Sequence, residues 1–407
     1  MSERRIPEDL VVDFDIHDDG LTPKVYERYA ELRRTCPVAW SDSHGGHWVL
    51  TRYTDIHEVN RCPQLFSNNP VGIPPNLGQD QPLIPLEIDP PEHTSYRHIL
   101  TPLFSPSRMN ALEPQIRSLV TELIDRFAAR GECDFIAEFA KPLPAQVFLG
   151  LMGWPQEDAT RLLKWTYDVI EGKPGGTDEE SNEVRTAAGL EIYTYFAELL
   201  DNAYEQPGDD IISQLTRARY EGERELSQFE ILNIVFIVML GGLHTVTGTL
   251  GNSLIYLAEH PGQRDRLAAD PALIPSAVEE LLRWESIVAP ARRVTEPVTL
   301  GGVEMQPGDR VLLALGAAGR DPEEFPDADD VVLDRVPNRH LAFGSGPHRC
   351  LGSHLARVEL KVALEEIHRR LPDYELVAGE PPVLRLHQVK GVERLKLRFT
   401  PEDRGAR

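Results

Sequence analysis

The amino-acid sequence predicts a mainly α-helical protein with a minor β component. Apolar residues recur at helical spacing along most of the chain, and strand-like alternation is confined to a few short runs. The length of 407 residues alone would suggest two or three domains, but no linker, repeat or low-complexity tract divides the sequence. Since 41% of the residues are hydrophobic, the chain has enough apolar material for one large core.

Two helices stand out in this pattern. One has an apolar stripe with spacings of three and four, made by Leu112, Ile116, Leu119, Val120, Leu123, Ile124 and Phe127. The other begins at Ser227, where Glu230 three residues later completes a capping box. It continues to about His260 and ends before Pro261. At 1.5 Å per residue this helix is about 50 Å long, which is enough to cross a whole domain.

The strand signals are short alternating runs beside turn residues. The runs cover residues 48–53, 298–303, 310–315, 384–387 and 395–399. The turn signals are Gly45-Gly46, Pro307-Gly308 and Lys390-Gly391. We therefore expect a small β-rich part formed by about residues 20–60, 298–316 and 384–400.

Charge and cysteine content restrict the class of protein. The formal net charge of −23 makes a nucleic acid or an anionic membrane an unfavourable partner and suits a soluble enzyme with an apolar substrate. The four cysteines are scattered without a CxxC pair, which indicates a reducing compartment rather than a disulfide framework or zinc site. No apolar segment opens the chain, and the most apolar window, residues 231–243, is too short to span a bilayer. We therefore expect a cytoplasmic protein.

The most informative stretch, residues 343–352, surrounds Cys350. Gly344 and Gly346 permit a tight turn with positive φ, and an amphipathic helix is predicted from Leu351 onward. Cys350 would then lie just before a helix N-terminus, which favours a thiolate that can bind haem iron. A buried structural cysteine and a Cys-His nucleophile are the alternatives, but neither explains the spacing of the phenylalanine, glycines and histidine.

This stretch closely resembles the cysteine-ligand loop of the cytochrome P450 superfamily, whose pattern is Phe-Gly-x-Gly-x-His-x-Cys-x-Gly, and it matches every fixed position. The resemblance implies a single haem-thiolate domain over residues 1–407, with about a dozen helices and a small β-rich lobe. It further implies that the cofactor is haem b, that Cys350 is the iron ligand, and that Phe343 and Gly352 lie against the haem.

Four cationic or donor side chains match the family's contacts to the haem propionates. His93 and Arg97 are four residues apart, so both can reach one anionic group, although such a pair can equally be a solvated helix face. The resemblance implies that these two, together with Arg292 and His348, bind the propionates. Burying those carboxylates without partners would be costly.

A second family feature is the pair Glu280 and Arg283, three residues apart on a predicted helix. By itself this pair is a weak signal, because solvated pairs of this kind are common. The resemblance implies that the pair, with Arg335, braces the cysteine loop and has no catalytic role.

The long central helix carries Gly241, Gly242, His244 and Thr245, where the family pattern is Ala/Gly-Gly-x-Asp/Glu-Thr. The resemblance implies that the glycines leave room for dioxygen and substrate, and that the threonine and the acid move protons. His244 stands where the acid is expected. Three alternatives remain: His244 is the proton shuttle, another group or water replaces the acid, or oxygen activation is impaired and the enzyme uses peroxide or coupling chemistry.

The resemblance implies a monooxygenase that inserts one oxygen atom from O2 into a small hydrophobic substrate. The alternatives are a peroxide-driven or oxidative-coupling haem enzyme, and a non-catalytic haem or ligand-binding sensor. The matching pocket segments are residues 67–85, 165–176, 239–245 and 287–289 and the turn near Val389.

Electrons must come from another protein, because the chain has no G-x-G-x-x-G dinucleotide fingerprint. We expect a ferredoxin or flavodoxin with an NAD(P)H-dependent reductase. Arg108, Arg349, Arg357 and Lys361 either form a basic docking patch for it or are ordinary solvated charges.

Overall fold

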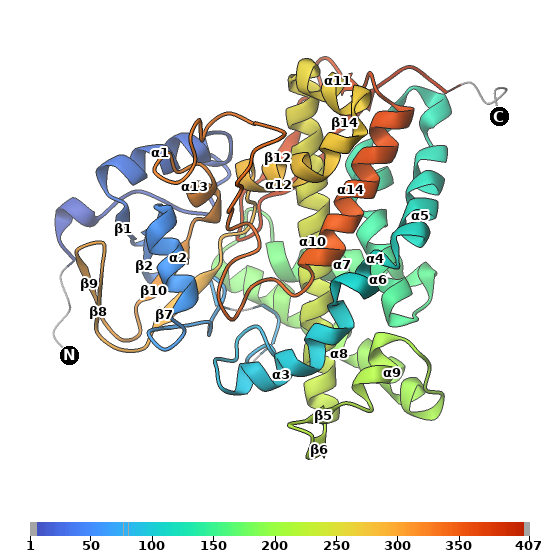
Figure 1. Ribbon diagram of the computed structural model, residues 1–407. Helices are drawn as coiled ribbons and strands as arrows, with labels where there is room; N and C mark the ends of the chain where they lie inside the picture. The colour runs from blue at the N-terminus through green and yellow to red at the C-terminus, as the bar shows by residue number, and fades with distance from the viewer. Residues whose placement is uncertain (1–5, 76, 80, 403–407) are drawn as a thin grey trace.

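The computed structural model describes residues 6–75, 77–79 and 81–402, so both ends of the predicted domain lie outside the described residues. Figure 1 shows a sheet-rich part on the side of the N-terminus and a larger helical part around the long central helix α10 (Gln228–Glu259). The predicted mainly α class is confirmed.

Most of the chain in the helical part forms α-helices joined by short turns. The α-helices before α10 are α1 (Val25–Thr35), α2 (Tyr53–Arg61), α3 (Glu92–Leu100), α4 (Pro106–Asn110), α5 (Glu113–Asp125), α6 (Pro142–Met152), α7 (Ala159–Glu171), α8 (Asp178–Glu205) and α9 (Ile211–Leu215). Those after it are α11 (Pro261–Ala269), α12 (Ile274–Trp284), α13 (Leu315–Gly319) and α14 (Ser353–Arg370).

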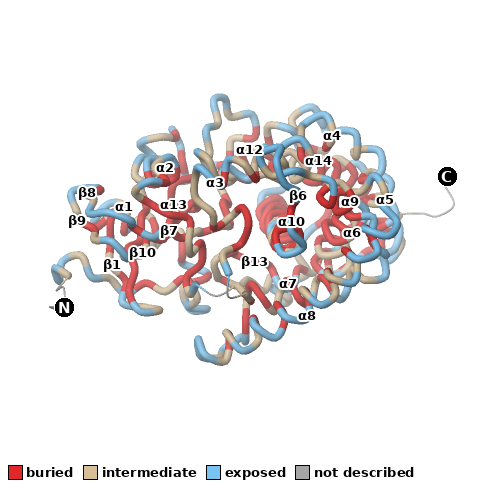
Figure 2. Tube along the Cα trace, turned by 90° about the horizontal axis from the view of Figure 1, so that it is seen from below, coloured by how far each residue is buried: buried red, intermediate tan, exposed pale blue. Residues whose placement is uncertain are grey.

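Helix α10 has the ends that the sequence predicts. The Ser227 hydroxyl accepts a hydrogen bond from the Glu230 N–H at 3.2 Å, and the Glu230 carboxylate accepts one from the Ser227 N–H at 2.7 Å. At the other end His260 closes the last turn, and Pro261 begins α11. In the view along α10 in Figure 2, this helix is mostly buried in the middle of the molecule.

Judged by length and composition alone, helix α10 is also long and apolar enough to cross a membrane. No other helix in the described part of the chain meets these two criteria. Its most apolar window is 61% buried by the rest of the fold. That burial is what the core helix of a folded domain shows.

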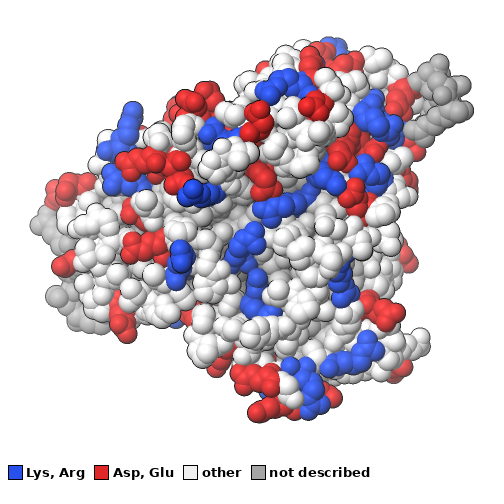
Figure 3. Space-filling model, viewed as in Figure 1, with Lys and Arg blue, Asp and Glu red and all other residues white. Residues whose placement is uncertain are grey.

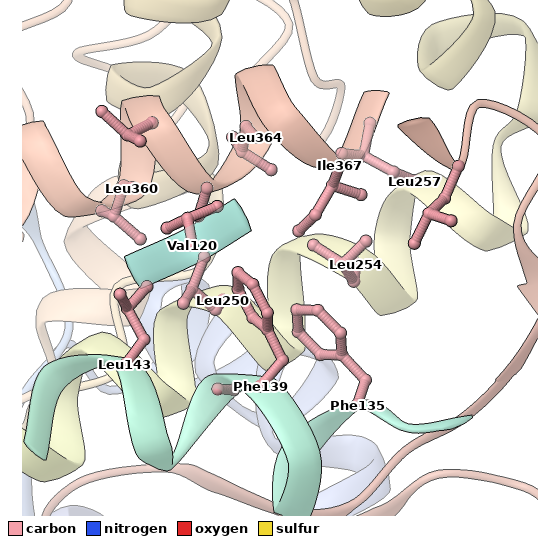
Figure 4. Packing of buried hydrophobic residues seen from close by; sticks show 14 of the residues in the cluster. Val120, Phe135, Phe139, Leu143, Leu250, Leu254, Leu257, Leu360, Leu364 and Ile367 are labelled. Carbon is pink, nitrogen blue, oxygen red and sulfur yellow. The ribbon is translucent and has the colours of Figure 1, made fainter. Parts of the chain in front are cut away.

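The largest buried cluster joins α5, α6, α10 and α14 (Figure 4). Leucines of α10 lie beside an apolar face of α14, with aromatic rings closing the other side. These residues include Leu250, Leu254, Leu257, Leu360, Leu364, Ile367, Phe135 and Phe139. The stripe predicted for α5 contributes Ile116, Val120, Leu123 and Ile124, so its inward face is confirmed. The helix that follows the cysteine loop is therefore packed directly on the central helix.

The main sheet has five strands in the order β1-β2-β10-β7-β3. They are β1 (Val38–Ser41), β2 (His47–Leu50), β10 (Arg310–Leu313), β7 (Ala291–Val294) and β3 (Phe66–Ser67). β10 runs parallel to β2, with Val311 opposite Trp48, and antiparallel to β7, with Val311 opposite Arg292. This register places Arg292 in the sheet next to the helical part.

The short sheets are β4 (Glu132–Asp134) with β14 (Lys396–Arg398) and β11 (Glu375–Leu376), and three hairpins. The hairpins are β5 (Arg219–Tyr220) with β6 (Arg224–Glu225), β8 (Val298–Leu300) with β9 (Val303–Met305), and β12 (Val383–Arg385) with β13 (Gly391–Arg394). Residues 384–400, expected in the lobe around residues 20–60, are divided between the two parts, since Leu386 packs in the buried cluster that contains Val25 and Val49. β13 packs on α10, and β14 pairs with β4 of the helical part.

Two further strand predictions have wrong boundaries. The expected strand over 48–53 ends at Leu50, because the Asp321 carboxylate accepts a hydrogen bond from the Tyr53 N–H at 2.8 Å and caps the start of α2. The expected strand over 298–303 is split into a hairpin. Gly301 (φ 56°) and Gly302 (φ 83°) both adopt the positive φ of a two-residue hairpin turn.

Candidate active site

The loop before α14 folds back tightly on itself. The Cys350 N–H donates to the Phe343 carbonyl at 2.8 Å, and Gly344 (φ 66°) and Gly346 (φ 71°) hold left-handed backbone. Gly346 also touches α2, since a Cβ there would come within 2.3 Å of the Asn60 carbonyl oxygen. The loop therefore needs these glycines, and it leaves Cys350 exposed three residues before α14.

The Cys350 thiol presents surface to solvent, yet protein atoms enclose it closely enough that burial raises its pKa. The hydrogen bond from the Gly352 N–H acts in the opposite direction. So do the charges of the nearby Arg97, Arg349 and Arg357, but their combined effect is smaller. The charges of the protein alone therefore do not favour the thiolate that the sequence predicts beside the helix N-terminus. Binding of a metal cation to the sulfur would stabilise the thiolate.

The structure brings together four side chains from three distant segments. His93 and Arg97 lie one turn apart on α3, Arg292 lies on β7, and His348 lies in the cysteine loop. The rings of His93 and His348 have centroids 4.1 Å apart. Arg292 is buried, and its guanidinium donates to the Asn60 side chain at 2.9 Å. The charges of these groups act on one another, so they form one cluster.

This cluster places arginine and histidine side chains in an environment that disfavours their charged forms. Burial lowers the pKa of Arg292 to about 10 and that of His93 to about 4, and burial with neighbouring cationic groups lowers the pKa of His348 to about 2. His93 Nδ1 and His348 Nε2 are buried without a hydrogen-bond partner among the described residues. The Asp89 carboxylate lies 3.9 Å from His348, too far for a hydrogen bond. An anionic ligand with several acceptor oxygens would fit this environment.

Behind the loop, Glu280 and Arg283 of α12 form a fully buried ion pair at 2.8 Å. Arg283 also donates to three backbone carbonyls, those of Gly319, Ala328 and Asp330. A charged group in the interior must be paired and hydrogen-bonded. These bonds therefore connect α12 to the end of α13 at Gly319 and to the loop that contains Ala328 and Asp330.

The same Glu280 carboxylate also forms an ion pair with Arg335 at 3.1 Å and accepts a hydrogen bond from the Asn338 side-chain amide at 3.0 Å. Sequence reasoning did not identify Asn338 or the Asn60 partner of Arg292. Neither position has a local signal, because each asparagine matters only through a residue far away in the chain.

Near the middle of α10, Gly241 is exposed and Gly242 is partly exposed, although much of this helix is buried. A Cβ built on either glycine would meet nothing within 4 Å. The Thr245 hydroxyl donates to the Gly241 carbonyl at 2.8 Å. This part of α10 therefore borders open space, and Thr245 lies at its edge.

His244 has a different environment, because it is buried at 1% exposure between α10 and α7. Its Nε2 lies 3.4 Å from a carboxylate oxygen of Glu171, the last residue of α7. Glu171 was missed as a partner because 73 residues separate it from His244 in the sequence.

The family profile for cytochrome P450 matches residues 167–372. Mycinamicin IV hydroxylase/epoxidase from Micromonospora griseorubida is 37% identical over 376 residues, covering 89% of this chain and 91% of that protein. The chain belongs to the cytochrome P450 family. The steroid C26-monooxygenase of Mycolicibacterium smegmatis is 35% identical over 380 residues, covering 92% of each chain. CYP109E1 from Bacillus megaterium, solved in complex with testosterone, matches this P450 with a TM-score of 0.87 at 31% identity, covering 94% of this chain and 100% of its own.

This P450 is therefore a haem-thiolate monooxygenase whose cofactor is haem b, acting on hydrophobic substrates with electrons from a separate redox partner. The chain has the groups to hold that cofactor, since Cys350 lies beside a cluster of cationic and donor side chains in which two ring nitrogens have no hydrogen-bond partner among the described residues. Bound haem supplies the iron at which dioxygen is activated.

Proposed function

We propose that Cys350 would bind the haem iron of this monooxygenase and that His93, Arg97, Arg292 and His348 would bind the haem propionates. The observation that carries this proposal is the convergence of these four groups beside Cys350, with their pKa values lowered by burial. Two propionate carboxylates would accept their hydrogen bonds and offset their charge. Phe343 and Gly352 belong to the same loop and would lie against the macrocycle.

The brace of Glu280, Arg283 and Arg335 has a structural role in this proposal. Its contacts hold the segment that leads into the cysteine loop, and none of its members touches Cys350 in the described contacts. Residues 1–407 would act as a single domain, because the loop, the anchors and the brace come from widely separated parts of the chain.

On the opposite side, Thr245 is proposed to hold and donate a proton during dioxygen activation. Gly241 and Gly242 leave the space beside it free. This arrangement favours an oxidative enzyme, whether a monooxygenase or a peroxide-driven or coupling enzyme, over a non-catalytic sensor, because the threonine and both glycines that the family uses for dioxygen are retained.

The three possibilities differ in two measurements on the purified haem-loaded protein. Testosterone and mycinamicin IV are suitable first compounds, since related P450s carry these molecules in their names or structures. We expect a compound that shifts the Soret band to be recovered with one added oxygen atom when NAD(P)H and a surrogate redox chain are supplied. Product formed only with peroxide would indicate the second function, and a shift with no product under either condition would indicate the sensor.

We further propose that the redox partner is a ferredoxin or flavodoxin that docks on the face of the cysteine loop in the cytoplasm. Basic side chains gather in the middle of the face viewed in Figure 3, and the loop before α14 lies on this face in Figure 1. Of the expected patch, Lys361 is paired with Glu113 at 2.7 Å and Arg357 with Glu279 at 2.6 Å. Arg349 is exposed and makes no ion pair with another described residue. Arg108 donates to the neutral Gln214 side chain at 2.8 Å, so the attraction would depend mainly on Arg349 and Arg108.

Arg349→Glu is expected to slow the first electron transfer from an acidic ferredoxin several-fold at low ionic strength, because it reverses a charge at the docking face. The difference should vanish near 1 M salt, where the Debye length is about 3 Å. Stopped-flow reduction measures this rate, with the haem spectrum as a check on the site. Arg34→Glu on α1 is the matched control, since Arg34 is exposed on the sheet-rich part. Equal rates in both variants at every salt concentration would refute docking at this face.

A further inference from the structure

The environment of His244 links the central helix to α7. Tyr167 and Glu171 are one turn apart on α7 and both contact the imidazole. The Tyr167 ring lies 4.8 Å from the His244 ring, and the Glu171 carboxylate lies 3.4 Å from Nε2. Behind the imidazole the chain comes close at Gly391, where a Cβ would lie 3.3 Å from the His244 ring. The imidazole is therefore held between α7 and β13.

The charges around this pair favour an ionised Glu171. Burial raises the pKa of Glu171, but the hydrogen bond and charge of His244, with smaller contributions from His387 and Lys141, together place it below its ordinary value. Burial lowers the pKa of His387, which limits its contribution. Lys141 lies over the Tyr167 ring, 4.3 Å from its centre.

Two other groups complete these surroundings. Burial raises the pKa of Tyr167 well above its usual value, so the phenol stays neutral. Glu393 of β13 adds a further negative charge near Tyr167. The carboxylate in contact with His244 is that of Glu171. It is suited to accept a hydrogen bond from a protonated ring nitrogen.

The two nitrogens of His244 have different partners. Nε2 faces the Glu171 carboxylate, which can only accept a hydrogen bond when ionised, so Nε2 must carry a proton. Nδ1 is buried and has no partner among the described residues. Since Nε2 is committed to the carboxylate, Nδ1 is the nitrogen of this ring that bears the lone pair in the neutral imidazole.

We infer that Glu171 is a positioning residue for His244, which accepts a hydrogen bond from Nε2 and so holds the imidazole in its Nε2–H tautomer. The acid that the family places before the threonine is thus supplied here by a carboxylate on α7, acting through an imidazole on α10. The inference rests on the proton-donating role proposed for this part of α10.

One consequence is that proton supply depends on the position of α7. This helix belongs to the segment, residues 165–176, that is expected to line the substrate pocket. A substrate that packs against α7 would then influence the contact between Glu171 and His244.

The test is an NMR titration of histidine ring nitrogens in 15N-labelled holoprotein, in the diamagnetic ferrous form with CO bound. In the unaltered protein, His244 should show a protonated Nε2 throughout and titration at Nδ1. Glu171→Gln should lower the proton-binding constant of His244 by about tenfold or more, because a contacting negative charge is lost. Glu171→Asp, which keeps the charge on a shorter side chain, should fall between the two.

The matched control is Asp168→Asn, which removes a carboxylate from the same helix at a position paired with Lys164. It should leave the titration of His244 unchanged. The fraction of electrons recovered in product should fall in Glu171→Gln. An unchanged proton-binding constant in Glu171→Gln, or a ring protonated at Nδ1 and not at Nε2, would overturn the inference. If His244 titrates as expected but no substrate is oxidised, the proposed function fails and the pairing stands.

Discussion

Cys350→Ser is expected to abolish oxygenation and the spectral signature of a thiolate in the reduced CO complex. Removing an outer-shell partner of a metal ligand typically costs 10- to 100-fold in metal affinity or activity, and removing the ligand itself should exceed about 100-fold. No other cysteine can take its place, because Cys36 and Cys133 are buried and Cys62 ends α2. Among the described residues, no group of three or more His, Cys, Asp or Glu side chains is arranged to hold a metal.

Cys62→Ser is the control for this prediction, since Cys62 is partly buried and lies outside the cysteine loop. It should keep the haem content, the thiolate spectrum and the turnover. Absorption spectra of the reduced CO complex and product yield per electron measure both variants. Retention of the thiolate spectrum in Cys350→Ser would show that another residue binds the iron.

Arg283→Met is expected to lower the free energy of unfolding by about 3–5 kcal/mol, the usual cost of removing one partner from a buried ion pair. Both Glu280 and Arg283 are 0% exposed, so the carboxylate would stay in the interior with Arg335, Asn338 and the Val332 N–H as its remaining partners in the described contacts. Three backbone carbonyls would also lose their donor. Because these contacts hold the segment before the cysteine loop, the variant should also retain less haem. Urea unfolding and the haem-to-protein absorbance ratio measure the two effects.

The double variant Glu280→Gln with Arg283→Met separates the buried charge from the lost hydrogen bonds. It should be more destabilised than Arg283→Met alone, because Arg335 then also loses the carboxylate with which it pairs. Arg126→Met serves as the surface control, since Arg126 forms an exposed pair with Glu122 on α5 and should change stability by less than about 0.5 kcal/mol. A cost for Arg283→Met no larger than that of Arg126→Met would show that the brace is unimportant.

Local signals predicted the elements whose causes are local. The ends of α10 follow from Ser227, Glu230 and Pro261, all of which act within one helical turn. The inward face of α5 follows from its apolar spacing alone. The strand over 48–53 was predicted too long because its end depends on Asp321, which is 268 residues away from Tyr53 in the chain.

The family is predictable from the short pattern of spaced residues around Cys350, and the mainly α class from the apolar spacing along the chain, because both signals lie in residues close together in the sequence. Only the tertiary structure decided which charges meet. Lys361 and Arg357 are neutralised by Glu113 and Glu279, and His244 is paired with Glu171. The physical reason is that hydrogen bonds and ion pairs depend on distances of a few ångströms between side chains on different helices. Such distances are set by the packing of α7, α10 and α14 and leave no periodic or local pattern in the sequence.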